Sequence, residues 1–108
     1  MSLDIWLEMD TGNGSSLSTD SLNVTYNVFR MYERAGVRDA LKGSDGRAAR
    51  EVADIFARGA DAMKADPGTY EAMNPANGWG DYEGAVEFLE QLADLCRLHP
   101  NAVIRTSQ

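Results

Sequence analysis

Cys96 and His99 are the only cysteine and the only histidine of the chain, which makes them the first candidates for a nucleophile and a base. Cys96, however, falls among the apolar positions of a predicted helix, where cysteine packs as a small hydrophobic residue. His99 stands at the end of that helix beside Pro100, where the helix dipole favours the imidazolium cation. We therefore assign no catalytic residue, and a single cysteine allows neither an intrachain disulfide nor a thiolate metal cluster.

Three carboxylates of the first predicted strand, Asp4, Glu8 and Asp10, project from one face and could in principle bind a cation. No calcium-loop pattern accompanies them, and zinc would lack thiolate or imidazole ligands. Exposed strand carboxylates, paired with Arg105 of the last predicted strand, are the better interpretation. We predict neither a metal site nor a cofactor.

The stretch 74–82, Asn-Pro-Ala-Asn-Gly-Trp-Gly-Asp-Tyr, carries the strongest local signals in the chain. Pro75 disfavours a helix immediately before it. Asn77 and Gly78 both tolerate positive φ, which is typical of a turn. Asp81 is the expected N-cap of a helix that begins at the next residue.

Trp79 lies between two glycines of this stretch, so nothing local holds its ring. A large indole must either pack onto the body of the protein or wait for a partner. We expect it to close the core beside the helix start, with a role in recognition as the alternative. Phosphate binding is disfavoured, because Asp81 would place its own carboxylate at the anion position and the loop contains no Lys or Arg.

A second polar cluster, residues 23–27, stands at the start of the first predicted helix. Asparagine amides at such positions commonly hydrogen-bond to backbone. If the two helix starts meet at one edge of the sheet, they would form an uncharged cleft with aromatic walls, suited to a neutral ligand, a peptide or a side chain of another protein. On this hypothesis the binding residues are Asn27, Asn74, Asn77, Trp79, Asp81 and Tyr82.

Strand signals occur at both ends of the chain. Residues 3–10 alternate between apolar and polar, which predicts a strand with one buried face. Trp6 falls on the polar side, so we expect that face to be partly covered by a neighbouring side chain or another subunit. A Gly/Asn/Ser loop over 11–16 leads to a short returning strand over 17–22, and residues 102–107 predict a final strand.

The first helix is expected where apolar residues take up helical spacing at Val24. Asn23 or Thr25 would cap it, and Gly36 would end it as a C-terminal glycine. Residues 37–41 are expected to form a short turn.

A second helix is expected after a cap at Ser44 or Asp45, and a third over residues 82–99. Pro67 and Gly68 interrupt the chain between them, before a single helical turn over 69–73. The apolar stripe of the second helix consists of Val52, Ile55, Phe56, Gly59 and Met63.

Together these elements predict a single α+β domain over residues 1–108. Its small antiparallel or mixed sheet would consist of an N-terminal hairpin and the C-terminal strand, packed against about three helices. An apolar content of 44% and a charged content of 25% suit one hydrophobic core in a chain of 108 residues.

The net charge of −7 argues against nucleic-acid binding and against binding to anionic membranes, which both need clustered Lys and Arg. No apolar run approaches the length of a membrane span. The N-terminus lacks the basic and apolar regions of a secretory signal, so a reducing cytoplasm is the expected location.

Three segments carry a resemblance to a known family: residues 3–12 (LDIWLEMDTG), residues 23–27 (NVTYN) and residues 74–82 (NPANGWGDY). The chain resembles an uncharacterised family of small proteins in actinobacteria and their bacteriophages. The resemblance spans nearly the whole chain, and residues 74–82 are its most specific part. It implies a cytoplasmic protein, with no assigned activity.

Two functions from different classes fit these observations. The preferred one is a non-enzymatic accessory or interaction protein, phage-encoded and acting on a host protein, whose Trp and Tyr residues anchor the interface. Self-association through open strand edges, giving a homodimer, is a further option. The alternative is a small ligand-binding protein or enzyme that uses the cleft near Trp79, with Asp10 or Asp81 as its base.

Overall fold

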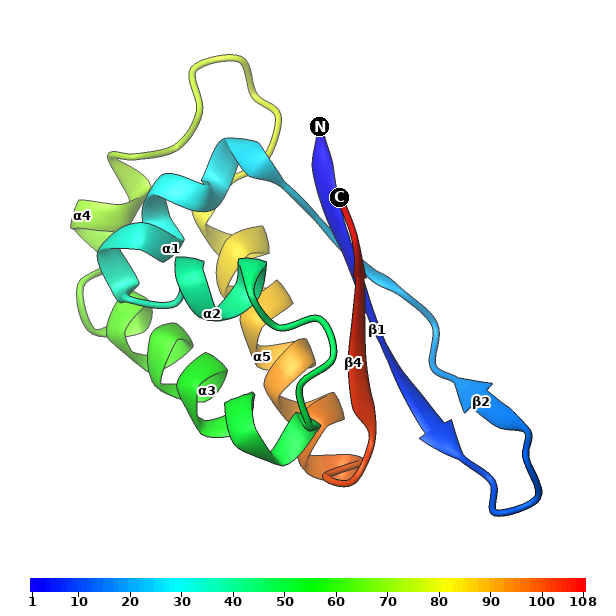
Figure 1. Ribbon diagram of the computed structural model, residues 1–108. Coiled ribbons are helices and arrows are strands. Elements are labelled where there is room, and N and C mark those ends of the chain that lie inside the picture. The colour runs from blue at the N-terminus through cyan, green and yellow to red at the C-terminus, as the bar shows by residue number, and fades with distance from the viewer.

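The computed structural model describes residues 1–108 and shows one antiparallel sheet with all helices on one side of it (Figure 1). This architecture confirms the predicted α+β class, and the sheet is antiparallel throughout. None of the helices combines the length and apolarity that crossing a membrane requires. In chain order the elements are β1 (Ser2–Asp10), β2 (Ser16–Ser18), β3 (Leu22–Thr25), η1 (Tyr26–Val28, a 3-10 turn), α1 (Phe29–Ala35), α2 (Arg38–Lys42), α3 (Ala49–Ala65), α4 (Pro67–Glu71), α5 (Tyr82–Leu98) and β4 (Val103–Ser107).

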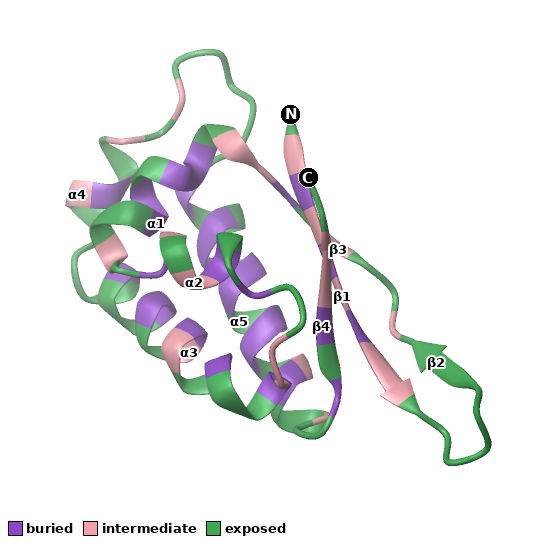
Figure 2. Ribbon diagram, in the orientation of Figure 1, coloured by how far each residue is buried: buried purple, intermediate pink, exposed green.

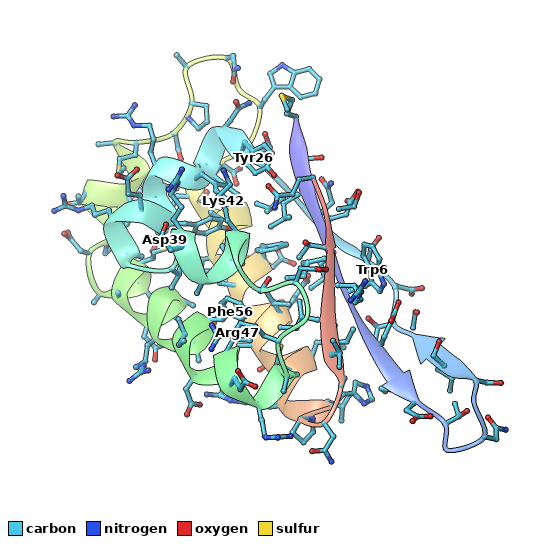
Figure 3. The ribbon with its side chains drawn as sticks, in the orientation of Figure 1. Trp6, Tyr26, Asp39, Lys42, Arg47 and Phe56 are labelled. Atoms are coloured by element: carbon cyan, nitrogen blue, oxygen red, sulfur yellow. The ribbon has the colours of Figure 1, made fainter.

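β1 is the central strand of the sheet, and its alternation gives it the one buried face that the sequence predicts. β4 pairs with one side of it, while β3 and β2 follow one another along the other side. Leu3, Ile5 and Leu7 point under the helices and are fully buried. Trp6 points away from the helices, is half-buried and lies opposite Arg105 of β4 (Figure 3).

The returning strand extends further than the predicted 17–22 and is broken in two. Thr19 marks the break, because its hydroxyl accepts the N–H of Leu7 at 3.0 Å while its own N–H donates to the Leu7 carbonyl at 2.9 Å. The chain then rejoins β1 as β3, which includes Val24. The prediction that helical spacing starts at Val24 was therefore wrong, since β-branched Val24 and Thr25 are held by pairing with β1.

The first helix begins later, with η1 leading into α1. Thr25, one of the two predicted caps, caps η1: its hydroxyl accepts the N–H of Asn27 at 3.2 Å. α1 itself begins after Val28 with no side-chain cap. Gly36 ends α1 with φ of 81°, as predicted. α1 is tied to α5 by the buried Tyr32 hydroxyl, which donates to the Ala85 carbonyl at 2.8 Å.

The predicted cap of α3 at Ser44 or Asp45 was wrong. The Ser44 hydroxyl instead donates to the Leu41 carbonyl at 2.8 Å, and the Asp45 carboxylate accepts the N–H of Thr106 at 2.9 Å. α3 begins after Ala48 with no side-chain cap. The N–H groups of Ala49 and Arg50 donate to the carbonyls of Ala102 (2.8 Å) and Pro100 (3.1 Å), in the segment that follows α5. These contacts satisfy the N–H groups that a side-chain cap would otherwise satisfy.

The outer edge of β4 is covered by the loop before α3. The N–H of Ile104 donates to the Arg47 carbonyl at 2.9 Å, and the Ile104 carbonyl accepts the N–H of Gly46 at 2.7 Å. Arg105 pairs with Asp45 at 3.9 Å rather than with the carboxylates of β1, so that prediction was also wrong. The open edge of the sheet is therefore the one formed by β2 and β3.

The long helices α3 and α5 lie antiparallel and bury their apolar stripes over the sheet (Figure 2). Ion pairs join them at two levels, Lys64 to Glu90 at 2.7 Å and Arg97 to Asp54 at 3.3 Å. The predicted stripe of α3 is buried apart from Ile55, which is half-buried. A single cluster of 27 buried residues forms the core.

Gly59 of α3 supports a close contact that can be tested. A Cβ atom at Gly59 would overlap Cγ1 of the buried Val37. We predict that Gly59→Ala lowers the free energy of unfolding by about 1–3 kcal/mol, because overpacking outweighs the better helix propensity of alanine. Urea denaturation measures the effect.

Two variants control this experiment. Gly68→Ala, where a Cβ has open space, should be neutral or stabilising by up to about 1 kcal/mol. Gly59→Ala combined with Val37→Ala should cost less than the sum of the two single changes. Additive costs in the double variant would show that the overlap with Val37 is not the cause.

Candidate functional site

The loop between α4 and α5 carries four of the six predicted binding residues, Asn74, Asn77, Trp79 and Asp81, and projects beyond the helices at one end of the molecule (Figure 1). Tyr82 is the first residue of α5, and Asn27 lies in η1. The predicted turn at Asn77 and Gly78 is present: the Asn77 side-chain oxygen accepts the N–H of Trp79 at 3.0 Å, and Gly78 has φ of 75°. Gly80 also has positive φ, at 98°. The backbone on both sides of Trp79 thus adopts a defined path that glycine makes accessible.

Two side chains of the loop, Asn74 and Asp81, hold it against the first turn of α5. The Asp81 carboxylate accepts the N–H of Gly84 at 2.8 Å, which confirms it as the N-cap. The Asn74 side-chain oxygen accepts the N–H of Tyr82 at 2.8 Å. Two of the N–H groups that a helix start leaves unpaired are therefore satisfied from within the loop.

The start of the first helix meets this loop, as the cleft hypothesis requires. The Asn27 side-chain N–H donates to the Trp79 carbonyl at 3.3 Å. Gly80 lies so close to β3 and η1 that a Cβ there would come within 2.7 Å of Thr25 Cγ2 and 2.9 Å of Val28 Cγ1. Sequence reasoning did not assign Gly80 or Val28 to the site. The glycine directly after Trp79 in the sequence was the available signal for such a close approach.

Trp79 does not close the core, contrary to expectation: the residue is 72% exposed. The aromatic residue that joins the core here is Tyr82, which is 8% exposed and stacks on Tyr70 with ring centroids 6.4 Å apart. The Tyr82 hydroxyl donates to the Met63 carbonyl at 3.0 Å. Burial, and secondarily the nearby Glu71 carboxylate, raises the pKa of Tyr82, so this phenol stays protonated and acts as structural support.

The six predicted residues come together in one loop region, but their side chains line no shared cleft. A hollow of about 160 Å³ beside the loop includes Thr25, Gly80 and Asp81 and leaves out Asn27, Trp79 and Tyr82. Asn74, Asn77 and Asp81 each accept a backbone N–H with one side-chain oxygen. This arrangement can present an indole to a partner surface rather than enclose a small molecule.

The other candidates for chemistry lie elsewhere. Cys96 is fully buried, and burial raises the pKa of its thiol to about 11, so the thiolate is scarce at neutral pH. His99 is half-buried and shares a hollow of about 350 Å³ with Met9 and Asp10. No group of three or more His, Cys, Asp or Glu side chains is placed to hold a metal ion.

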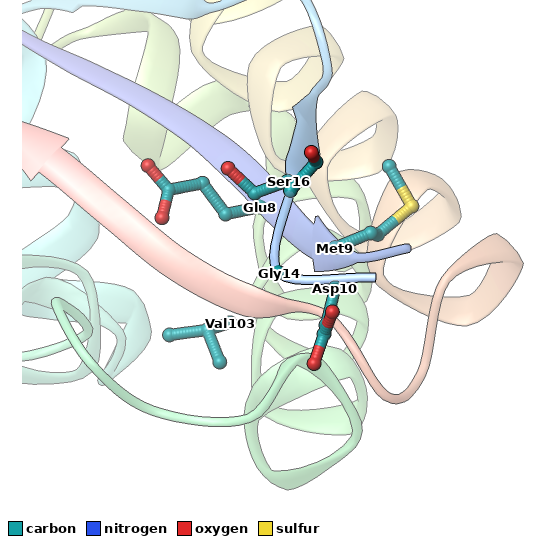
Figure 4. A pocket seen from close by; sticks show the side chains of 7 residues that line it. Glu8, Met9, Asp10, Gly14, Ser16 and Val103 are labelled. Atoms are coloured by element: carbon teal, nitrogen blue, oxygen red, sulfur yellow. The ribbon is translucent and has the colours of Figure 1, made fainter. Parts of the chain in front are cut away.

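A hollow at the turn end of the β1–β2 hairpin contains two of the strand carboxylates. Glu8 and Asp10 line it together with Ser16 and Val103, in a volume of about 360 Å³ (Figure 4). The two carboxylates turn away from each other in Figure 4. Asp4, the third carboxylate, lies further along β1 and accepts the Asn23 side-chain N–H at 2.7 Å. The three carboxylates therefore do not converge on one point.

Comparison of the chain with protein-family models, curated proteins and solved structures finds no match. No residue role can be taken from a relative.

The exposed position of Trp79 predicts a separation between stability and recognition. Trp79→Ala should change the free energy of unfolding by less than about 0.5 kcal/mol, because the indole buries little surface. Asp81→Ala should lower it by about 1 kcal/mol, because the cap of α5 is lost. Urea denaturation measures both. A loss of more than about 2 kcal/mol in Trp79→Ala, typical of a core aromatic, would contradict the exposed position.

The buried thiol of Cys96 predicts a loss of stability in alkali. Its pKa is about 11 in the folded chain against an ordinary value of 9.0, so the protonated thiol favours folding below pH 9. This contribution should disappear as the pH rises from 9.0 to about 11. Buried Tyr32, whose pKa is also raised by burial, adds to the fall at higher pH.

Cys96→Ala separates the two contributions. In urea denaturation between pH 8 and 11 the variant should lose less stability with rising pH than the wild type. Identical slopes for the two proteins would show that the thiol does not titrate on unfolding. A thiol reagent should label native Cys96 slowly and unfolded Cys96 fast, which checks its burial independently.

Proposed function

We propose that this chain is a non-enzymatic interaction protein that binds another protein through Trp79. The observation that carries the proposal is a 72% exposed indole on a loop whose backbone is held from both sides by hydrogen bonds. Trp is among the residues most often found at the energetic centre of protein interfaces. An exposed indole on a mobile tail would be much weaker evidence for a binding role.

The held backbone supports binding in energetic terms. Ordering a loop on association costs free energy, and a loop already held by Asn27, Asn74 and Asn77 has less freedom to lose. The indole adds a large apolar area and one N–H donor to an interface. In this proposal the three asparagines do not contact the partner themselves. They hold the loop backbone that presents Trp79 to it.

The small-molecule alternative has less support. A ligand-binding cleft normally encloses most of its ligand. The hollow beside the loop measures about 160 Å³ and excludes Trp79 and Asn27, the two residues that the cleft hypothesis places at its walls. Of its two candidate bases, Asp81 caps α5 by accepting the N–H of Gly84, and Asp10 lines hollows that include neither Asn27 nor Trp79.

The partner that best fits the resemblance of residues 3–12, 23–27 and 74–82 is a protein of an actinobacterial host cell. In this proposal the chain is phage-encoded and acts in the cytoplasm of that host. A net charge of −7 favours a protein partner over nucleic acid. A second copy of the chain is the alternative partner, which sedimentation of the purified protein would detect as a dimer.

The test is retention of a binding partner from an actinobacterial lysate on the tagged chain. A protein retained by the wild type should be lost with Trp79→Ala. With the identified partner, calorimetry should show Kd raised at least about thirtyfold, which corresponds to the 2 kcal/mol of an interface anchor. Trp79→Phe, which keeps an aromatic ring, should retain part of the affinity.

Val103→Ala is the matched control, because Val103 is also an exposed apolar residue but lies on the sheet. It should bind the partner like the wild type, and circular dichroism should show both variants folded. Equal affinity of Trp79→Ala and wild type for every retained protein would overturn the proposal.

A further inference from the structure

A second surface lies at the opposite end of α5 from the Trp79 loop and is independent of it. Where the edge strand breaks between β2 and β3, a hollow of about 460 Å³ opens against the last turns of α5. It is the largest hollow of the molecule. We call it the edge groove. The side chains that define it are Asp20, Leu22, Asp94, Leu95 and Leu98.

The floor of the edge groove is apolar and lacks a covering element. Leu98 is 71% exposed, and Leu22 and Leu95 are half-buried. Leu17 of β2 lies further along the same edge and is 62% exposed. Single exposed leucines are ordinary, but a contiguous group along a groove is typical of a surface that is covered in a complex.

The strand wall of the edge groove offers free backbone groups. Thr19 is the last residue before the break that pairs with β1. The N–H and C=O groups of Asp20 and Ser21 make no hydrogen bond within the protein. An extended chain placed beside this edge could pair with them, in the manner of strand addition to an open sheet edge.

The rim of the edge groove is negatively charged. Asp20 stands on the strand wall and Asp94 on the helix wall, and no Lys or Arg lines the groove. The nearest cation on the last turns of α5, Arg97, is paired with Asp54 of α3. A second copy of this chain, with its own charge of −7, would bring like charges together here.

We propose that the edge groove binds an extended segment of another protein in which leucine-like residues alternate with Lys or Arg. Alternate side chains of an extended segment point to opposite faces. The apolar ones would pack on Leu22, Leu95 and Leu98, and the cationic ones would reach Asp20 and Asp94 at the rim. This surface gives the chain a second contact that does not depend on Trp79.

The test uses a fluorescent seven-residue peptide of alternating Lys and Leu, acetylated and amidated, with a Glu-for-Lys peptide as its counterpart. Anisotropy titration of the full chain should show binding of the Lys peptide and at least tenfold weaker binding of the Glu peptide. Amide NMR shifts on adding the Lys peptide should centre on residues 19–22 and 91–98. Absence of binding up to millimolar peptide would overturn the proposal.

Variants separate the groove from general attraction between a basic peptide and an acidic protein. Leu98→Ser should weaken binding about tenfold without unfolding an exposed position. Asp20→Asn with Asp94→Asn should weaken it and reduce its dependence on salt. Asp66→Asn with Glu71→Gln changes the net charge equally at exposed sites away from the groove and should leave binding unchanged. Equal weakening by the two charge pairs would refute a specific site.

Two further measurements distinguish this proposal from binding through Trp79 and from dimer formation through the edge groove. Trp79→Ala should bind the Lys peptide like the wild type, so failure of one surface is separable from failure of the other. Sedimentation of the free chain should show a monomer. A dimer that Leu98→Ser dissociates would assign the edge groove to a second copy of the chain and would overturn the proposal of a basic segment.

Discussion

The burial of one face of β1 beneath the helices is the constraint on which the rest of the structure depends. Leu3, Ile5 and Leu7 are inaccessible to solvent, and a strand with period two must then direct Asp4, Trp6 and Glu8 outward. A slip of one residue would expose the three aliphatic side chains. The registers of β3 and β4 follow from this choice, since both strands pair with β1.

α5 connects the two surfaces proposed for binding, and its ends are built differently. Its N-terminus is closed by Asp81 and Asn74, which makes the preceding loop a firm support for the exposed indole. Its C-terminal turns extend past the cover of the edge strand, which leaves Leu95 and Leu98 beside the break at Thr19. α5 therefore contributes to the core along its length, supports the Trp79 loop at its N-terminus and forms one wall of the edge groove at its C-terminus.

Sequence patterns captured the site in part. Local rules predicted the cap at Asp81 and the turn at Asn77 and Gly78, because both depend on residues a few positions apart. The exposure of Trp79 escaped prediction. Tyr82 rather than Trp79 packs into the core, where it stacks on Tyr70, and Gly80 lies against Thr25, more than 50 residues away in the chain. Neither contact follows from a local pattern.

The sequence by itself determined the α+β class, the buried face of β1 and the ends of α5, because periodicity and capping are local properties. Only the tertiary structure decided where α3 begins, since carbonyls at Pro100 and Ala102 receive its first N–H groups in place of a side-chain cap. It also decided that Val24 belongs to a strand, because pairing with Leu3 prevails over helical spacing. Such contacts join residues distant along the chain, and no local pattern encodes them.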